Sequence, residues 1–234
     1  MNGPSTQANR GEEVRERYWG APLLGVLFIA LAIAGFTIGG EPPDFDEGAQ
    51  AAVDFYTDDK DSIEAGSLLG GLGAIVLLFF AGVVRSRLRE TEGLRGTLSA
   101  IAFGGAIVLA TGLAIDSTIN FAAAEAADDL DPSGIHTLSA LWQNDWIPFA
   151  VGALTFVLAT SVSIVRFGVL AKWLGYLGIL LAILLATPLG EFVFPVLGLW
   201  VIALSVMLAL RDRKLAAGTP PAGGASPAAG APTV

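Results

Sequence analysis

The strongest candidate for chemistry in this chain is an acid inside an apolar stretch. Asp116 is the only acid well inside the run Leu98–Ala127, and Asn120 follows it after one helical turn. A carboxylate there either binds a proton or cation beside an outward-facing cavity, or makes a structural polar contact with a neighbouring helix or water. On a helical wheel both residues share a stripe with Gly105 and Gly112, a mixture typical of a helix-packing face. Asp116 and Asn120 are therefore the candidate polar site, and both interpretations stay open.

The residue types that catalysis usually needs are scarce. The chain has no cysteine and a single histidine, His136. Thiol nucleophiles, thiolate metal sites and two-histidine metal sites are therefore excluded. No serine lies in a G-x-S-x-G turn, and we expect His136 to be an exposed loop residue. We predict no catalytic residue, cofactor or resident metal, and no enzyme activity.

A cluster of acids before the second apolar stretch has two interpretations. Its carboxylates are hard oxygen ligands of the kind that Ca²⁺ takes, but their spacing does not match an EF-hand loop. Solvation of an exposed surface is the simpler interpretation, and we favour it over a divalent cation site. The cluster consists of Asp58, Asp59, Asp61 and Glu64.

The composition indicates which elements position these groups. Of the 234 residues, 53% are hydrophobic and only 15% are charged, whereas soluble domains carry about 25% charged residues. About 20 apolar residues cross the ~30 Å hydrocarbon core as a helix. We therefore predict an all-α, polytopic membrane protein that is a bundle of six transmembrane helices, with spans at about 21–39, 65–84, 98–122, 147–165, 168–186 and 193–210.

The charges predict the orientation of this bundle. Twelve of the 13 lysines and arginines lie before the first span, between the second and third spans, between the fourth and fifth spans, or after the last span. Lys60 is the exception. Fifteen of the 22 acids lie in the three loops between the remaining neighbouring spans. The positive-inside rule then places the N-terminus and the C-terminus in the cytoplasm of a bacterial cell, with the protein in the plasma membrane. The basic residues lie next to the membrane, where they suit anionic lipid headgroups better than nucleic acid.

The segments outside the spans divide into tails and loops. Residues 1–20 and 211–234 read as cytoplasmic disordered tails, the second of them basic and then Pro/Gly/Ala-rich. The acidic loop Glu41–Glu64 contains a short amphipathic segment, with Ala52, Phe55 and Tyr56 on one side. We expect a basic turn at Arg85–Gly96, a loop at Ala126–Asp145 and Pro195 near a helix end. Glycine pairs at G-x-x-x-G spacing, 35/39 and 66/70, predict close helix packing.

Two runs resemble a family of six-helix, largely actinobacterial membrane proteins of unknown function. The first is Tyr56–Gly93, in which a polar pre-helix leads to a glycine-rich span and an arginine-rich turn, RSRLRETEG. The second is Val165–Gly178, where Ala171 stands at the family's usual proline and Tyr176 at its second tryptophan. The resemblance covers residues 45–210. It implies the six-helix architecture and adds neither a substrate nor catalytic residues.

Two functions remain open from the sequence. The first is a non-enzymatic membrane protein, a structural, assembly or regulatory partner of other membrane proteins or of further copies of itself in the lipid bilayer. The second is a small transporter or channel that uses Asp116 and Asn120 in an outward-facing cavity. The thin polar lining of the spans, and the absence of a central proline in any of them, favour the first.

Overall fold

The computed structural model describes residues 20–93, 96–187 and 190–217, and this part of the chain is helical without strands. Five of its helices are long and apolar enough to cross a membrane, and a sixth apolar helix is shorter. The chain therefore has the make-up of an all-α, multi-pass membrane protein. The predicted tails lie mostly outside the described residues, at 1–19 and 218–234.

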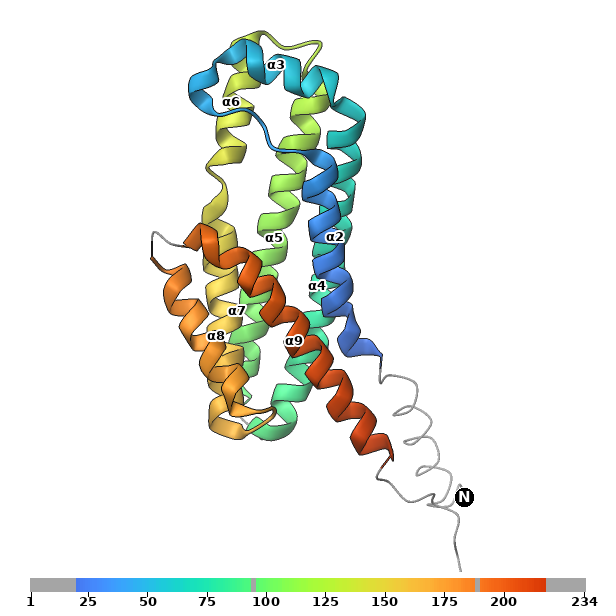
Figure 1. Ribbon diagram of the computed structural model, residues 1–234, viewed down its shortest axis with the longest axis vertical. Coiled ribbons are helices and arrows are strands. Elements are labelled where there is room, and N and C mark those ends of the chain that lie inside the picture. The colour runs from blue at the N-terminus through green and yellow to red at the C-terminus, as the bar shows by residue number, and fades with distance from the viewer. Residues whose placement is uncertain (1–19, 94–95, 188–189, 218–234) are drawn as a thin grey trace, which may run out of the picture.

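Four helices run lengthwise through the molecule and form its main bundle (Figure 1). They are α2 (Leu24–Gly39), α4 (Lys60–Glu92), α5 (Thr97–Ala126) and α7 (Trp146–Phe167). A short 3₁₀ turn, Ala21–Leu23, precedes α2. At 1.5 Å per residue the 33 residues of α4 extend about 50 Å, well beyond a ~30 Å hydrocarbon core. Part of α4 must therefore project out of the membrane.

Glycines fix the contact between α2 and α4. A Cβ atom on Gly66 would lie 2.7 Å from the carbonyl oxygen of Gly35 and equally close to the backbone of Gly39. Only glycine, whose side chain is a single hydrogen atom, allows the two backbones to approach so closely. The two G-x-x-x-G pairs of the sequence therefore pack against each other within one chain, as the packing interpretation predicts.

The contact between α5 and α7 has the same basis. A Cβ atom on Gly105 would lie 2.5 Å from the backbone nitrogen of Phe156, and one on Gly152 would overlap the backbone of Leu109. Side chains above and below these glycines complete the main apolar core, in which Phe80 and Phe156 meet edge to face at 6.4 Å. The bundle is therefore closely packed along its axis.

Two short helices cap one end of the bundle, at the top of Figure 1. They are α3 (Ala49–Asp58), which follows the 3₁₀ turn Phe45–Glu47, and α6 (Pro132–Gln143). A second apolar cluster, separate from the main core, holds both helices on the tips of α4 and α5. Its buried members are Ala52, Tyr56, Ile63, Ala123, Ala124, Ala127 and Ile135. We call α3, α6 and these tips the outer cap.

The last two helices form a hairpin against the opposite half of the bundle. α8 (Lys172–Leu185) has 14 residues and packs on α7, where Gly175 and Gly178 face Ser161. α9 (Gly190–Ala217) has 28 residues and runs obliquely across the front of the bundle in Figure 1. The indole of Trp200 on α9 donates a 3.0 Å hydrogen bond to the carbonyl of Leu174, so a buried polar contact joins the two helices of the hairpin in addition to their apolar packing.

The helices differ from the sequence expectations at four places. The first residues of the predicted disordered tail 211–234 are helical, because α9 continues to Ala217. The expected basic turn Arg85–Gly96 is helical as far as Glu92, because good helix formers continue α4 until Gly93, whose φ of 74° suits the end of a helix. The expected loop Ala126–Asp145 contains α6. Pro195 lies inside α9 rather than near its end, because α9 already begins at Gly190.

Candidate functional site

Asp116 lies on α5 in the outer half of the bundle and is half-buried. With Ser117 and Asn120 it lines a narrow pocket, whose other walls are the glycine faces of α2 and α4. The pocket has a volume of about 30 Å³, which is room for one or two water molecules. The structure thus brings the two candidate residues to one pocket, as the helical wheel predicts, but this pocket is too small for an organic solute.

Asn120 joins this pocket to the outer cap. Its side-chain oxygen accepts a 3.0 Å hydrogen bond from the hydroxyl of Tyr56 on α3. Tyr56 is fully buried, and this burial raises the pKa of its phenol above the ordinary value, so the hydroxyl stays protonated as a donor. The sequence placed Tyr56 on the apolar face of a short helix but gave no sign of this partner, which is 64 residues away.

A second carboxylate lies near Asp116, at the junction of α6 and α7. It belongs to Asp145, the residue before α7, and Trp142 of α6 also lies near Asp116. One oxygen of Asp145, Oδ2, is buried and accepts no hydrogen bond from any described residue. Sequence analysis missed Asp145 because it counted this acid with the outer loop. Its position directly before the fourth apolar span was the available signal.

These groups define what the site can do chemically. A carboxylate in an apolar span can bind a proton, a water molecule or a small cation. The side-chain oxygens of Ser117 and Asn120 are further ligand candidates in the same pocket. No described group of three or more acidic, histidine or cysteine side chains is arranged to hold a metal ion. The site therefore suits a proton, a water molecule or a monovalent cation.

Known proteins do not identify the chain. No protein-family model matches it, and no curated protein or solved structure is similar enough to count as a match. The resemblance to six-helix membrane proteins of unknown function stays a prediction.

Both glycines of the predicted stripe of α5 face the same neighbour. Gly105 and Gly112 face α7, and a Cβ atom on Gly112 would lie 3.1 Å from Pro148. Ser117, next to Asp116, faces α4 instead, where a Cβ atom on Gly70 would lie 2.5 Å from its hydroxyl oxygen. Asp116 thus lies between two glycine-lined contacts of α5, which explains its half-buried position.

The remaining candidates belong to the outer cap. His136 lies on α6 rather than in a loop. Its ring stacks on Phe45 at 4.1 Å between centroids, and its Nε2 lies 3.0 Å from the carbonyl oxygen of the same residue. Of the acidic cluster, Asp58, Asp59 and Asp61 are exposed, and Glu64 pairs with Lys60 at 3.9 Å. The positions of the acids favour a solvated acidic surface. The contacts of His136 with Phe45 hold the 3₁₀ turn against α6.

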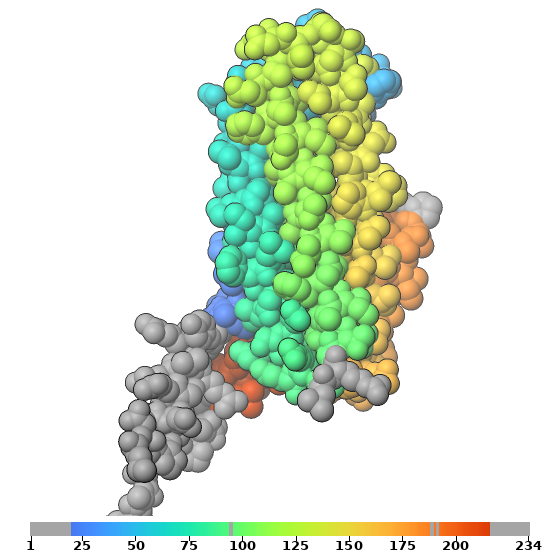
Figure 2. Space-filling model, turned by 180° about the vertical axis from the view of Figure 1, so that it is seen from behind, coloured from blue at the N-terminus to red at the C-terminus, as the bar shows by residue number. Residues whose placement is uncertain are grey.

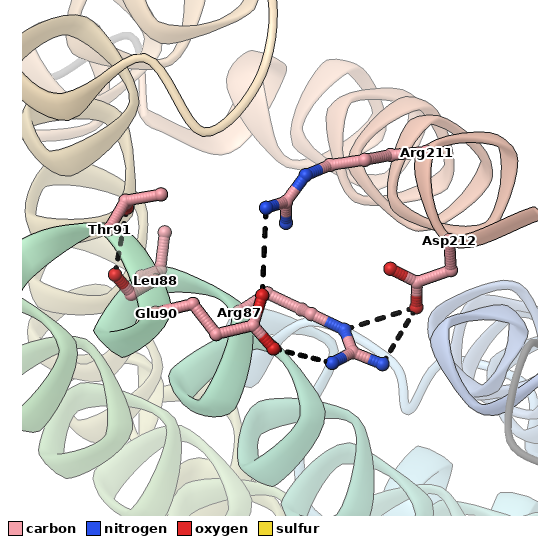
Figure 3. A network of polar contacts seen from close by, with 6 residues as sticks. All are labelled: Arg87, Leu88, Glu90, Thr91, Arg211 and Asp212. Atoms are coloured by element: carbon pink, nitrogen blue, oxygen red, sulfur yellow. Dashed lines mark hydrogen bonds and ion pairs between the residues drawn. The ribbon is translucent and has the colours of Figure 1, made fainter. Parts of the chain in front are cut away.

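A charged network joins the helices at the opposite end of the bundle (Figure 3). Arg87 on α4 donates to one carboxylate oxygen of Asp212 on α9 from two nitrogens, at 3.0 and 2.9 Å. Arg87 also pairs with Glu90 at 2.6 Å, and Glu90 pairs with Arg211 at 3.5 Å. We call these four residues the inner network. It fixes the end of α9 against the end of α4, although the two lie 125 residues apart.

Proposed function

We propose that the chain crosses a bacterial plasma membrane six times, with both termini in the cytoplasm. Support comes from the charges, because the described basic residues other than Lys60 gather at one end of the bundle. That end holds Arg85, Arg87, Arg89, Arg166, Lys172, Arg211, Arg213 and Lys214. Most of the described acids lie at the other end, in the outer cap and in the segment that leads into it. This separation supports the proposed orientation, because the positive-inside rule then puts the outer cap on the side away from the cytoplasm.

α8 is the shortest of the apolar helices, but its length does not alter the proposed orientation. The 14 residues of α8 extend about 21 Å, less than the hydrocarbon core, so the crossing needs the flanking residues or a locally thinner bilayer. The hairpin starts beside the end of α7 and ends at the inner network. Both ends of the hairpin therefore lie at the basic end of the bundle, whatever depth its turn reaches.

The function that the geometry supports best is non-enzymatic: a structural, assembly or regulatory partner of other membrane proteins or of further copies of itself. One observation carries this proposal. The outer cap is a folded body with an apolar core of its own, and its charged residues are mostly exposed, whereas the pocket at Asp116 has room for water alone. A fixed, exposed surface is suited to binding a partner, and a close-packed bundle is poorly suited to passing solutes.

Site-specific photocrosslinking in intact cells tests this partner role. A photoreactive amino acid at Thr57, exposed on the outer cap, is compared with one at Leu72, which is exposed on the apolar face of α4. We expect Thr57 to give a discrete protein adduct and Leu72 to give lipid adducts. If Thr57 and several neighbouring exposed cap positions yield no protein adduct, the partner role is wrong.

Transport of a proton or monovalent cation is the second candidate function. The carboxylate of Asp116 at a water-sized pocket, together with Ser117 and Asn120 in the same lining, favours it. In vesicles reconstituted with the full chain, Asp116→Asn should abolish a cation-dependent or pH-dependent flux, while Asp54→Asn on the exposed surface of α3 should leave it unchanged. Absence of flux in the unsubstituted protein, or equal flux in both variants, would reject Asp116 as a transport site.

A further inference from the structure

A second hollow lies at the basic end of the molecule, between α4 and α5. It has a volume of about 490 Å³ and is lined by Gly82, Arg85, Ser86, Arg89, Glu90 and Phe103. This size is within the range of small-molecule pockets. The lining residues belong to α4 and α5, which lie side by side along the rear surface of the molecule (Figure 2). The hollow is therefore open to whatever surrounds the bundle.

Two arginine side chains are held in place at this hollow. The guanidinium of Arg85 lies over the ring of Phe103, 5.2 Å from its centroid. The aliphatic part of Arg89 packs at Gly96, where a Cβ atom would lie 3.4 Å from its Cγ. Both contacts limit the rotamers of the arginines and leave their donor groups free to bind. Ser86 adds an exposed hydroxyl to the same rim.

The charge of the hollow is positive. Among the described residues, no carboxylate pairs with Arg85 or Arg89, whereas the one acid of the lining, Glu90, pairs with both Arg87 and Arg211. The negative charge of Glu90 is thus already compensated by the inner network. Planar guanidinium groups with free donors bind phosphate oxygens well.

The surface that leads away from the arginines is apolar. Along α4, Ile75, Phe79 and Gly82 share a helical face, and the first two are 53% and 67% exposed. On α5, Ile107 is 43% exposed, one turn beyond Phe103. A Cβ atom on Gly82 or Gly104 would touch nothing within 4 Å. The hollow is thus continuous with a shallow apolar surface that runs toward the middle of the span.

We propose that this hollow binds the phosphate of an anionic glycerophospholipid, with Arg85, Arg89 and Ser86 holding the headgroup and an acyl chain lying over Gly82 toward Phe79. The adjoining apolar surface favours a lipid over a free phosphate ester, because only a lipid has an acyl chain that can lie on this surface while its phosphate contacts the arginines. The proposal rests on the membrane placement above, in which the hollow faces the headgroups of the cytoplasmic leaflet.

Lipid binding to the purified full-length chain in detergent tests the proposal. Native mass spectrometry measures adducts with phosphatidylglycerol and with phosphatidylcholine of identical acyl chains. We expect phosphatidylglycerol to be preferred and the double variant Arg85→Gln/Arg89→Gln to weaken its binding roughly tenfold or more. The matched control is Arg166→Gln/Arg213→Gln, which removes two charges from the same end. Arg166 also lies over a phenylalanine, Phe167, at 5.7 Å.

A second pair of variants separates shape from charge. Gly82→Leu fills the hollow without changing the charge and should also weaken phosphatidylglycerol binding, whereas Gly71→Leu, an equally open glycine of the same helix, should not. Equal losses of phosphatidylglycerol binding in the pocket variants and in their controls would overturn the proposal. Displacement of phosphatidylglycerol by glycerol 3-phosphate at the same concentration as the lipid would also overturn it. Because detergent exposes both ends of the protein, these outcomes do not depend on which end is cytoplasmic.

Discussion

The two ends of the bundle are held together by different forces. At the outer cap, neutral contacts join segments far apart in the chain, for example Tyr56 to Asn120, and Gln143 to the carbonyl of Pro43 at 2.7 Å. Among the described residues, the only ion pair there is Lys60 with Glu64. At the basic end, the inner network joins α4 to α9 through ion pairs.

This difference follows from the charge composition of each end. Acids with a single base, Lys60, among them repel one another and can form few ion pairs, so the outer cap depends on an apolar core. At the basic end, Glu90 and Asp212 lie among arginines and form pairs with them. Salt should therefore act in opposite directions, relieving repulsion in the outer cap and weakening the inner network.

Removing apolar volume from the outer cap should have the largest effect. Ile135 is fully buried in the second cluster, so Ile135→Ala should lower the free energy of unfolding of the cap by about 3 kcal/mol. We expect faster hydrogen exchange in α3 and α6 with unchanged exchange in α7 and α9. If exchange rose equally in all helices, the cap would not be a separate apolar unit. Ile147→Ala, at an exposed apolar position of α7, is the control.

Breaking the inner network should have a smaller, salt-dependent effect. Asp212→Asn weakens both contacts with Arg87 and should cost about 1 kcal/mol of unfolding free energy at low salt, because the pair is only partly buried. Thermal unfolding at low and at molar salt measures this cost. The difference in unfolding free energy between Asp212→Asn and the unsubstituted protein should shrink at high salt. A difference that is independent of salt would contradict an electrostatic role. Arg213→Gln, an exposed charge outside the network, is the control.

The neutral contact at the outer cap gives a third, smaller effect. Tyr56→Phe removes the hydroxyl that Asn120 accepts from, and should destabilise the cap by roughly 1 kcal/mol at neutral pH with little dependence on salt. Asn120 stays half-buried without this donor, which is the physical cause of the loss. Hydrogen exchange in α3 measures it, and a strong salt dependence would show that the contact is not the neutral one described.

Because the pKa of the Tyr56 phenol is raised, the difference in stability between the unsubstituted protein and Tyr56→Phe depends on pH. The ordinary value is 10.0, and burial raises it in the folded state. The neutral phenol therefore contributes its full stability below pH 10, and this contribution is lost as pH rises above 10, because the unfolded chain then releases a proton that the folded chain retains. The stability advantage over Tyr56→Phe should shrink above pH 10. An advantage that grows there would contradict the burial of the phenol.

Some of this arrangement could be predicted from the sequence and some could not. Hydrophobic length marks the long apolar helices, and helical spacing places Asp116 and Asn120 at one pocket. The residues Asp131 and Pro132 also mark the start of α6. The Asp131 side chain accepts from the hydroxyl of Ser133 and from the backbone N–H groups of Gly134 and Ser133, and these hydrogen bonds lower its pKa. This N-terminal capping signal lies in the segment 126–145, which the sequence otherwise predicts to be a loop.

Other features depend on contacts that no local pattern encodes. Arg87 and Asp212 meet only because the α8–α9 hairpin returns α9 to the end of α4. Tyr56 reaches Asn120 only because α3 folds onto the tip of α5. In both cases the partners are on different helices, and helical periodicity carries no information about which helices become neighbours.

The central claim is that the outer cap faces away from the cytoplasm while the arginine-rich end faces it. Because the chain has no cysteine, single-cysteine variants report on one position each. Ser62 and Ser133 are exposed on the outer cap, and Ser86 is exposed at the basic end. In intact cells, a membrane-impermeant thiol reagent should label Ser62→Cys and Ser133→Cys but label Ser86→Cys only after the membrane is permeabilised. The reverse pattern would contradict the orientation and, with it, the assignment of the two ends.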